Sequence, residues 1–244
     1  MKKERLRMQI ELIRRLGKDS FILIPYIFSK KIKHNKLKLH EYLLNSVAQI
    51  EATLFSDPYR HETPVSQFLY RTKGKLFVDV GANLGRYEVL LGKNYERVIA
   101  IEPSPENMSF LKRNVANVKV KNIEFLQCAV SGQNGTATLF YGEHCGAHTL
   151  MSTNLNVEGL QVKTVTLDTL LKREDNVDLV KVDVEGAEWE VLEGSKEVLP
   201  KIKRWVVEVH NLEQKGNIAK WFEDKGYAIM WLDINHVYAE RKIE

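Results

Sequence analysis

Residues 76–86 read Leu-Phe-Val-Asp-Val-Gly-Ala-Asn-Leu-Gly-Arg. The first five residues predict a buried strand, and Gly81 and Gly85 predict a tight turn before a helix that begins near Arg86. In open α/β sheets ligands bind at the carboxyl ends of the strands, where glycines let the backbone approach them closely. The spacing is G-x-x-x-G, and the G-x-G-x-x-G pattern of dinucleotide-binding proteins is absent. The stretch therefore predicts a ligand site at the end of a strand. It lacks the glycine pattern that would be the main evidence for NAD as the ligand.

Short β-rich runs alternate with helical patterns after this turn. Such alternation is typical of a doubly wound α/β domain, in which helices cover both faces of a sheet. The last two strands are joined by four residues, too few for a helix, so they predict an antiparallel hairpin and a mixed, Rossmann-like sheet of seven strands. The expected strands are 76–80, 98–101, 123–127, 179–183, 205–209, 228–232 and 237–240; the expected helices include 105–115, 186–192 and 218–225; a second small β element comprises 136–141 and 162–167.

The N-terminal part of the chain differs from the rest. Residues 1–73 have apolar residues at spacings of three and four, which predicts a helical region that Pro58 and Pro64 interrupt; the main domain is expected at 74–244. Residues 1–38 contain 12 Lys and Arg against 3 Asp and Glu, although the whole chain has a formal charge of only +4. This basic segment is compatible with RNA binding, with an acidic glycan or membrane surface, and with a plain solvated face.

Cysteine usage and hydropathy indicate the compartment. Cys128 and Cys145 form neither a disulfide framework nor a zinc spacing, so a reducing compartment, the cytoplasm, is expected. The apolar run 21–28 falls far short of the roughly 20 residues that a membrane-spanning helix needs. Lysines follow it instead of a small-residue cleavage site, which argues against a signal peptide. We expect a soluble cytoplasmic protein with no transmembrane segment.

The second strand ends in Ile101-Glu102-Pro103-Ser104-Pro105. A carboxylate at this place, roughly 20 residues beyond the glycine turn, can accept hydrogen bonds from both hydroxyls of an adenosine ribose. Ser104 and Pro105 supply the cap and the first residue of the next helix. Glu102 is therefore left for a ligand, and we expect it to hold a nucleoside.

These two motifs combine with others in an order that resembles the FkbM family of class I S-adenosylmethionine-dependent methyltransferases. The resemblance covers residues 76–209. It implies the class I methyltransferase fold, S-adenosylmethionine as cofactor, and methyl transfer. The motifs are D-V-G-A-N-L-G at 79–85, I-E-P-S-P-E-N at 101–107, C-A-V-S at 128–131 with G-T-A-T-L at 135–139, V-T-L-D at 165–168 and K-V-D-V-E-G-A-E at 181–188.

The resemblance also implies which residues bind the cofactor. The residues of the glycine turn would surround its amino-acid and ribose parts, Glu102 would hold the ribose hydroxyls, and the backbone near Cys128 would flank the adenine. The expected cofactor-binding residues are Asp79, Gly81, Asn83, Gly85, Glu102, Cys128, Ala129 and Asp183.

Acidic residues and one histidine follow the fourth and fifth strands. Methyl transfer is an in-line displacement that depends on positioning, and a hydroxyl acceptor must also lose a proton. The expected catalytic residues are Asp183, Glu185 and His210, with Glu185 or His210 as the base. Glu208 shares a strand face with His210, and these two side chains are alternatively a hydrogen-bonded pair that steadies the sheet. Glu188 is interpreted as a first-turn residue favoured by the helix dipole.

We predict no metal. The carboxylates near His210 could converge on Mg²⁺ or Mn²⁺, and His144, Cys145 and His148 offer three zinc ligands without an evident fourth; neither site is expected. The glycine-containing stretch around Cys145 is interpreted as a mobile loop over the substrate pocket, with His148 and Thr149 near the acceptor.

The expected function is methylation of a hydroxyl of a small molecule or sugar. The alternative is an RNA methyltransferase that binds tRNA through residues 1–38. A third hypothesis, a non-catalytic protein that binds an adenosine ligand, is disfavoured because Asp79, Glu102 and Asp183 are all present.

Overall fold

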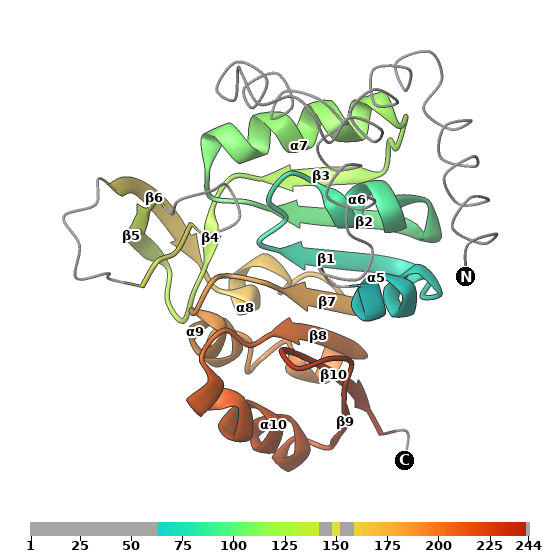
Figure 1. Ribbon diagram of the computed structural model, residues 1–244, viewed down its shortest axis with the longest axis vertical. Helices are drawn as coiled ribbons and strands as arrows, with labels where there is room; N and C mark the ends of the chain where they lie inside the picture. Colours follow the sequence, from blue (N-terminus) through green and yellow to red (C-terminus); the bar gives the residue numbers. More distant parts are fainter. Residues whose placement is uncertain (1–62, 142–147, 152–158, 243–244) are drawn as a thin grey trace, which may run out of the picture.

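The computed structural model describes residues 63–141, 148–151 and 159–242 of the chain (Figure 1). Most of the helical region predicted for 1–73 lies outside the described residues. Its last part is helix α5 (Thr63–Tyr70). Pro64 lies in the first turn of α5, where a missing N–H costs no intrahelical hydrogen bond. The residues before it lie outside the described residues, so the interruption of a preceding helix stays a prediction.

A seven-stranded mixed sheet forms the centre of the fold, in the order β3-β2-β1-β7-β8-β10-β9. The first five of these strands are parallel, and β10 is antiparallel to both β8 and β9. The predicted α/β fold with a terminal hairpin is confirmed. The strands are β1 (Gly74–Val80), β2 (Tyr95–Ile101), β3 (Ile123–Leu126), β7 (Leu179–Val182), β8 (Arg204–Glu208), β9 (Tyr227–Trp231) and β10 (His236–Arg241).

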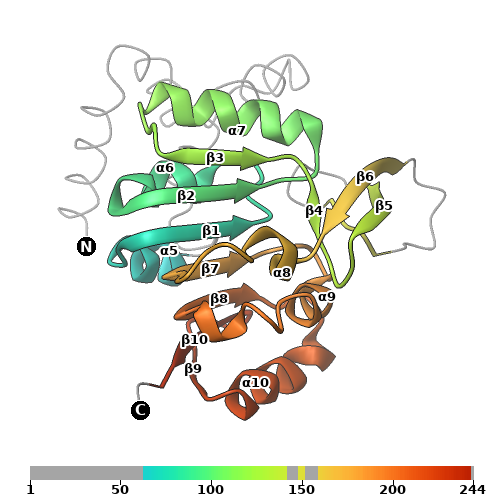
Figure 2. The same cartoon turned by 180° about the vertical axis from the view of Figure 1, so that it is seen from behind.

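Helices cover both faces of this sheet (Figures 1 and 2). Helices α5, α6 (Arg86–Leu91) and α7 (Pro105–Asn117) lie on one face, and α8 (Leu167–Leu170), α9 (Glu188–Glu193) and α10 (Lys215–Asp224) lie on the other. Short 3₁₀ turns are η2 (Gly92–Asn94), η3 (Leu199–Lys201) and η4 (Leu212–Gln214). Among the described residues, none of the helices has the length and hydropathy that crossing a bilayer requires.

Strand β1 shows how the sheet separates two cores. Val78 and Val80 belong to the larger core, which includes Trp205, whereas Phe77 faces the opposite side and packs in the core that contains Leu69. Side chains alternate between the two faces of a strand. Because Val65 and Leu69 of α5 are fully buried in this second core, α5 is part of the same packed unit as the sheet.

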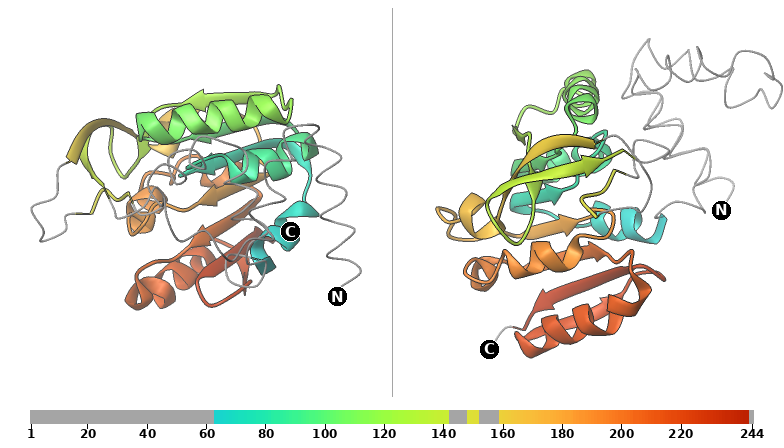
Figure 3. Two further views of the ribbon diagram at one scale, coloured as in Figure 1. Left: turned by 45° about the horizontal axis from the view of Figure 1, so that its top comes forward. Right: turned by 90° about the vertical axis from the view of Figure 1, so that its left-hand side faces the viewer.

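A small second sheet stands at the carboxyl ends of the parallel strands (Figures 1 and 3). Strand β5 (Gly135–Phe140) pairs antiparallel with β6 (Gly159–Val165), which confirms the predicted second β element. The short strand β4 (Ala129–Val130), which the sequence did not reveal, pairs parallel with β6. This sheet borders the edge where ligands bind in such folds.

Candidate active site

The glycine turn between β1 and α6 packs directly against the end of β7. Gly81 and Gly85 have φ of +82° and +88°, a left-handed conformation that glycine adopts without strain. A Cβ atom added to Gly81 would lie 1.8 Å from the carbonyl oxygen of Asp183. Gly81 is therefore needed for close approach of two strand ends, whereas Gly85 lies beside Leu111 of α7.

Replacement of Gly81 by alanine is expected to destabilise the fold by about 3 kcal/mol, because the backbone of β7 must move. Two matched variants separate the causes. Gly226 has the same φ of +82° with nothing within 4 Å of an added Cβ, and the helical Gly216 is equally open. In denaturant unfolding, the free energy of unfolding should be lowest for Gly81→Ala, higher for Gly226→Ala and highest for Gly216→Ala. Equal stability of the first two variants would contradict the close approach.

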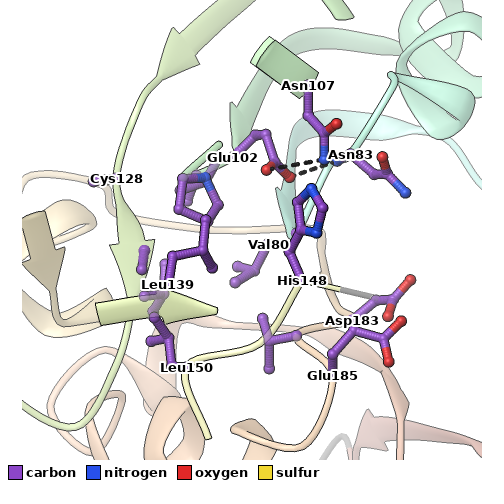
Figure 4. A pocket seen from close by; sticks show the side chains of 16 residues that line it. Val80, Asn83, Glu102, Asn107, Cys128, Leu139, His148, Leu150, Asp183 and Glu185 are labelled. Carbon is purple, nitrogen blue, oxygen red and sulfur yellow. Dashed lines mark hydrogen bonds between the residues drawn. The ribbon is translucent and has the colours of Figure 1, made fainter. Parts of the chain in front are cut away.

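Glu102, directly after β2, holds the glycine turn from the other side. Its carboxylate accepts hydrogen bonds from the backbone N–H of Asn83 at 2.9 Å and from Nδ2 of Asn107 at 3.4 Å (Figure 4). It also accepts one from the backbone N–H of Ser104 at 2.9 Å. Ser104 caps α7 with its own side chain, as predicted. Burial raises the pKa of Glu102 to about 7. An ionised carboxylate offers about four acceptor positions. The three internal donors leave one position for a ligand hydroxyl, and a second hydroxyl would displace the long 3.4 Å contact from Asn107.

One pocket joins most of the predicted cofactor-binding residues to two of the predicted catalytic residues. It is lined among others by Gly81, Asn83, Glu102, Cys128, Ala129, Asp183 and Glu185. Asp79 and Gly85 do not line it. Asp79 is fully buried and lies beside Lys181. The carboxyl ends of β1, β2 and β7 thus meet around one pocket. Asp79 and Gly85 lie outside its lining.

Residues 148–151 cross this pocket. His148 lines it and, in the view of Figure 4, projects between Glu102 and Asp183. Thr149 bridges to Phe140 of β5 and donates a hydrogen bond from Oγ1 to the carbonyl oxygen of Glu185 at 2.6 Å. His144 and Cys145 lie outside the described residues.

Four carboxylates surround His210. Its Nδ1 lies 2.8 Å from Oε1 of Glu188, and its Nε2 lies 3.2 Å from Oε2 of Glu185, 3.8 Å from Oε1 of Glu208 and 4.0 Å from Oδ1 of Asp183. Burial lowers the pKa of His210, but the hydrogen bond to Glu188 and the nearby negative charges outweigh it and raise this pKa to about 9. Burial raises the pKa of Glu185 to about 7, against the charge of His210.

Glu188 has a role that its position in the sequence did not reveal. It lies in the first turn of α9, as predicted, but it is fully buried and accepts hydrogen bonds from His210 and from the N–H of Gly186. The helix starts at Glu188 and not at Gly186, because Glu185 and Gly186 have φ of +54° and +105°. In the sequence, the pattern E-x-x-E with a glycine after its first glutamate was the available signal for a turn before α9.

Glu208 lies between two histidines. Besides its contact with His210, its Oε2 lies 3.3 Å from Nε2 of the buried His236, whose Nδ1 lies 2.8 Å from Oδ1 of Asp233. The predicted proximity of Glu208 and His210 is confirmed, whereas His236 was not foreseen because it follows a turn late in the chain.

Asp183, Glu185 and His210 each offer one ligand-type atom, and these atoms lie within 4.8 Å of one another. The imidazolium of His210 already places a positive charge among these carboxylates. The arrangement suits proton transfer and also has the donor atoms of a divalent-cation site, so the prediction of no metal stays a prediction.

Known methyltransferases resemble this chain in sequence. Residues 79–229 match the model of the methyltransferase FkbM domain. The chain is 33% identical over 190 residues to methyltransferase sdnD of Sordaria araneosa, covering 62% of this chain and 73% of that protein. It is 30% identical over 137 residues to the hexuronic acid methyltransferase AglP of Haloferax volcanii, covering 54% of each. A putative methyltransferase from Streptococcus mutans, solved in complex with SAH, superposes with a TM-score of 0.48 at 12% identity, covering 75% of this chain and 98% of that one.

Proposed function

Because the chain belongs to the FkbM family of methyltransferases, we propose that it transfers a methyl group from S-adenosylmethionine to a hydroxyl of a small molecule or sugar. The observation that carries this proposal is the single pocket that contains both Glu102 and the pair Asp183 and Glu185. A nucleoside-binding carboxylate and a candidate base thus face the same space.

The residues of the pocket fit the cofactor. Oδ1 of Asn83 is buried and has no hydrogen-bond partner among the described residues, so it is available to a donor on a ligand. Glu102 retains acceptor capacity for the ribose hydroxyls. S-adenosylmethionine supplies an electrophilic methyl group on a positively charged sulfur. Asn83 and Glu102 would hold it, with the backbone at Gly81, Cys128 and Ala129 around it.

The two candidate bases differ in the proton that they carry. With a pKa of about 9, His210 is protonated at neutral pH and cannot accept a proton. Glu185, with a pKa of about 7, is matched to this task, because a base works best when its pKa lies near the working pH. We propose that Glu185 is the general base that accepts the proton of the acceptor hydroxyl. His210 orients Glu185 through its Nε2.

The acceptor is proposed to be a sugar or small molecule because the relative AglP is named a hexuronic acid methyltransferase. The basic residues 1–38, the basis of the RNA alternative, lie outside the described residues. A cytoplasmic location stays a prediction from the two cysteines.

Incubation of the full chain with methyl-labelled S-adenosylmethionine tests the acceptor class. One reaction contains bulk tRNA, a second contains glucuronic and galacturonic acids, and a third contains a glycan and metabolite extract. We expect label in the second or third reaction. Label in tRNA alone, lost when residues 1–38 are deleted, would overturn the sugar or small-molecule acceptor in favour of RNA.

A further inference from the structure

Three ionisable side chains lie buried beneath the glycine turn, outside the pocket. Asp79, Glu88 and Lys181 are at most 2% exposed. Asp79 and Lys181 face each other across β1 and β7, with 3.7 Å between Oδ1 and Nζ. Nζ of Lys181 also lies 4.8 Å from the centre of the Tyr87 ring. Burying charged side chains costs free energy unless they are paired, so a buried group of this kind suggests a structural or functional role.

The charges in this group follow from its burial. Burial and the neighbouring Asp79 hold the pKa of Glu88 well above its usual range, so Glu88 keeps its proton. The ammonium of Lys181 lies 3.7 Å from the carboxylate of Asp79, which is the geometry of a buried ion pair. Removing one partner of such a buried pair strands the other charge in the core.

The ammonium of Lys181 also contacts a residue that lines the pocket. Lys181 and Asp183 are two residues apart, so their side chains leave the backbone on the same side. Nζ of Lys181 donates a hydrogen bond to Oδ2 of Asp183 at 3.1 Å. Asp183 is part of the pocket lining, and its other oxygen, Oδ1, lies 4.0 Å from Nε2 of His210. Lys181 therefore fixes one oxygen of a pocket carboxylate from behind the wall.

We propose that Lys181 is a positioning residue: anchored on Asp79, its ammonium holds the carboxylate of Asp183 in the pocket, where this carboxylate opposes the positive sulfur of S-adenosylmethionine. This inference rests on the proposed function. S-adenosylhomocysteine has the same adenosine and amino-acid parts but no charge on its sulfur. An effect that acts through Asp183 therefore falls on S-adenosylmethionine, whereas an effect on the fold weakens both ligands.

Two variants isolate this effect. Lys181→Met alone is expected to lose stability, because it removes the ammonium that pairs with the buried Asp79. The double variant Asp79→Asn/Lys181→Met removes both charges, and Asp79→Asn is its matched control, since it keeps Lys181 beside Asp183. By calorimetry we expect the double variant to bind S-adenosylmethionine about tenfold more weakly than Asp79→Asn, because Asp183 has lost a charge-assisted hydrogen bond. Both variants should bind S-adenosylhomocysteine equally. Thermal unfolding without ligand is measured alongside, because Asp79→Asn leaves the ammonium of Lys181 without its Asp79 partner, whereas the double variant removes both charges.

The outcomes distinguish this inference from the proposed function. Asp183→Asn should reproduce the selective loss of S-adenosylmethionine affinity. An unchanged ratio of the two affinities between the double variant and Asp79→Asn would overturn the positioning role of Lys181. Equal weakening of both ligands would also overturn it, in favour of a structural role. If the wild-type chain binds neither ligand, the proposed function fails, and this inference fails with it.

Discussion

Glu185→Gln is expected to lower the turnover number by about 10² to 10⁴-fold, the usual contribution of general base catalysis. Glutamine keeps the size of the side chain and its contact with His210, but it cannot accept the acceptor proton. Affinity for S-adenosylhomocysteine should stay close to that of the wild type, because the adenosine is held at Glu102. The measurement is the rate of methyl transfer to the acceptor that takes label in the screen, at saturating cofactor.

The pH profile gives the same prediction a second readout. Because the pKa of Glu185 is raised to about 7, the wild-type turnover number should rise as pH rises through this value. Glu185→Gln should lack this limb. Glu193→Gln is the matched control: it changes a partly exposed carboxylate on α9 and should leave turnover unchanged. A Glu185→Gln variant with wild-type turnover would exclude Glu185 as the base.

Glu102→Ala is expected to weaken S-adenosylmethionine binding by about 100-fold, since two hydrogen bonds from ligand hydroxyls to a carboxylate are lost. The control is Glu106→Ala, which removes an exposed carboxylate from the first turn of α7. Because Glu102 also accepts the N–H of Asn83, circular dichroism and thermal unfolding should accompany the calorimetry. Unchanged affinity in Glu102→Ala would contradict the assignment of the ribose.

The affinity for S-adenosylmethionine should also depend on pH, because Glu102 titrates. Ligand hydroxyls donate to the ionised form of Glu102, whose pKa is about 7 before binding. Binding therefore lowers this pKa and releases a proton, so affinity falls as pH falls below about 7. Calorimetry in two buffers of different ionisation enthalpy measures this proton release.

The sequence predicted the sheet and its site because strand ends carry strong local signals. The stretch 76–86 combines an apolar strand, two glycines and a helix, and the carboxylate of Glu102 follows the next strand. In a parallel sheet, neighbouring strands end at the same edge. Their proximity could therefore be expected without a structure, and the pocket that contains Gly81 and Glu102 agrees with it.

The environment of the ionisable groups could not be predicted in the same way. Whether Glu185 or His210 is the base depends on their pKa values, which are set by burial and by Glu188, a residue on another element. Asp79 does not line the pocket, and the alternation of side chains along β1 places it with Lys181 on the opposite face from Val80; its predicted role at the cofactor stays a prediction. Such placements depend on packing between distant segments.

The central claim is that the pocket at the ends of β1, β2 and β7 holds the cofactor. A crystal structure of the full chain with S-adenosylhomocysteine tests it most directly. We predict that the ribose hydroxyls lie within hydrogen-bond distance of Glu102 and that the sulfur lies next to Asp183. Binding at another place, or a ribose that does not reach Glu102, would contradict the account.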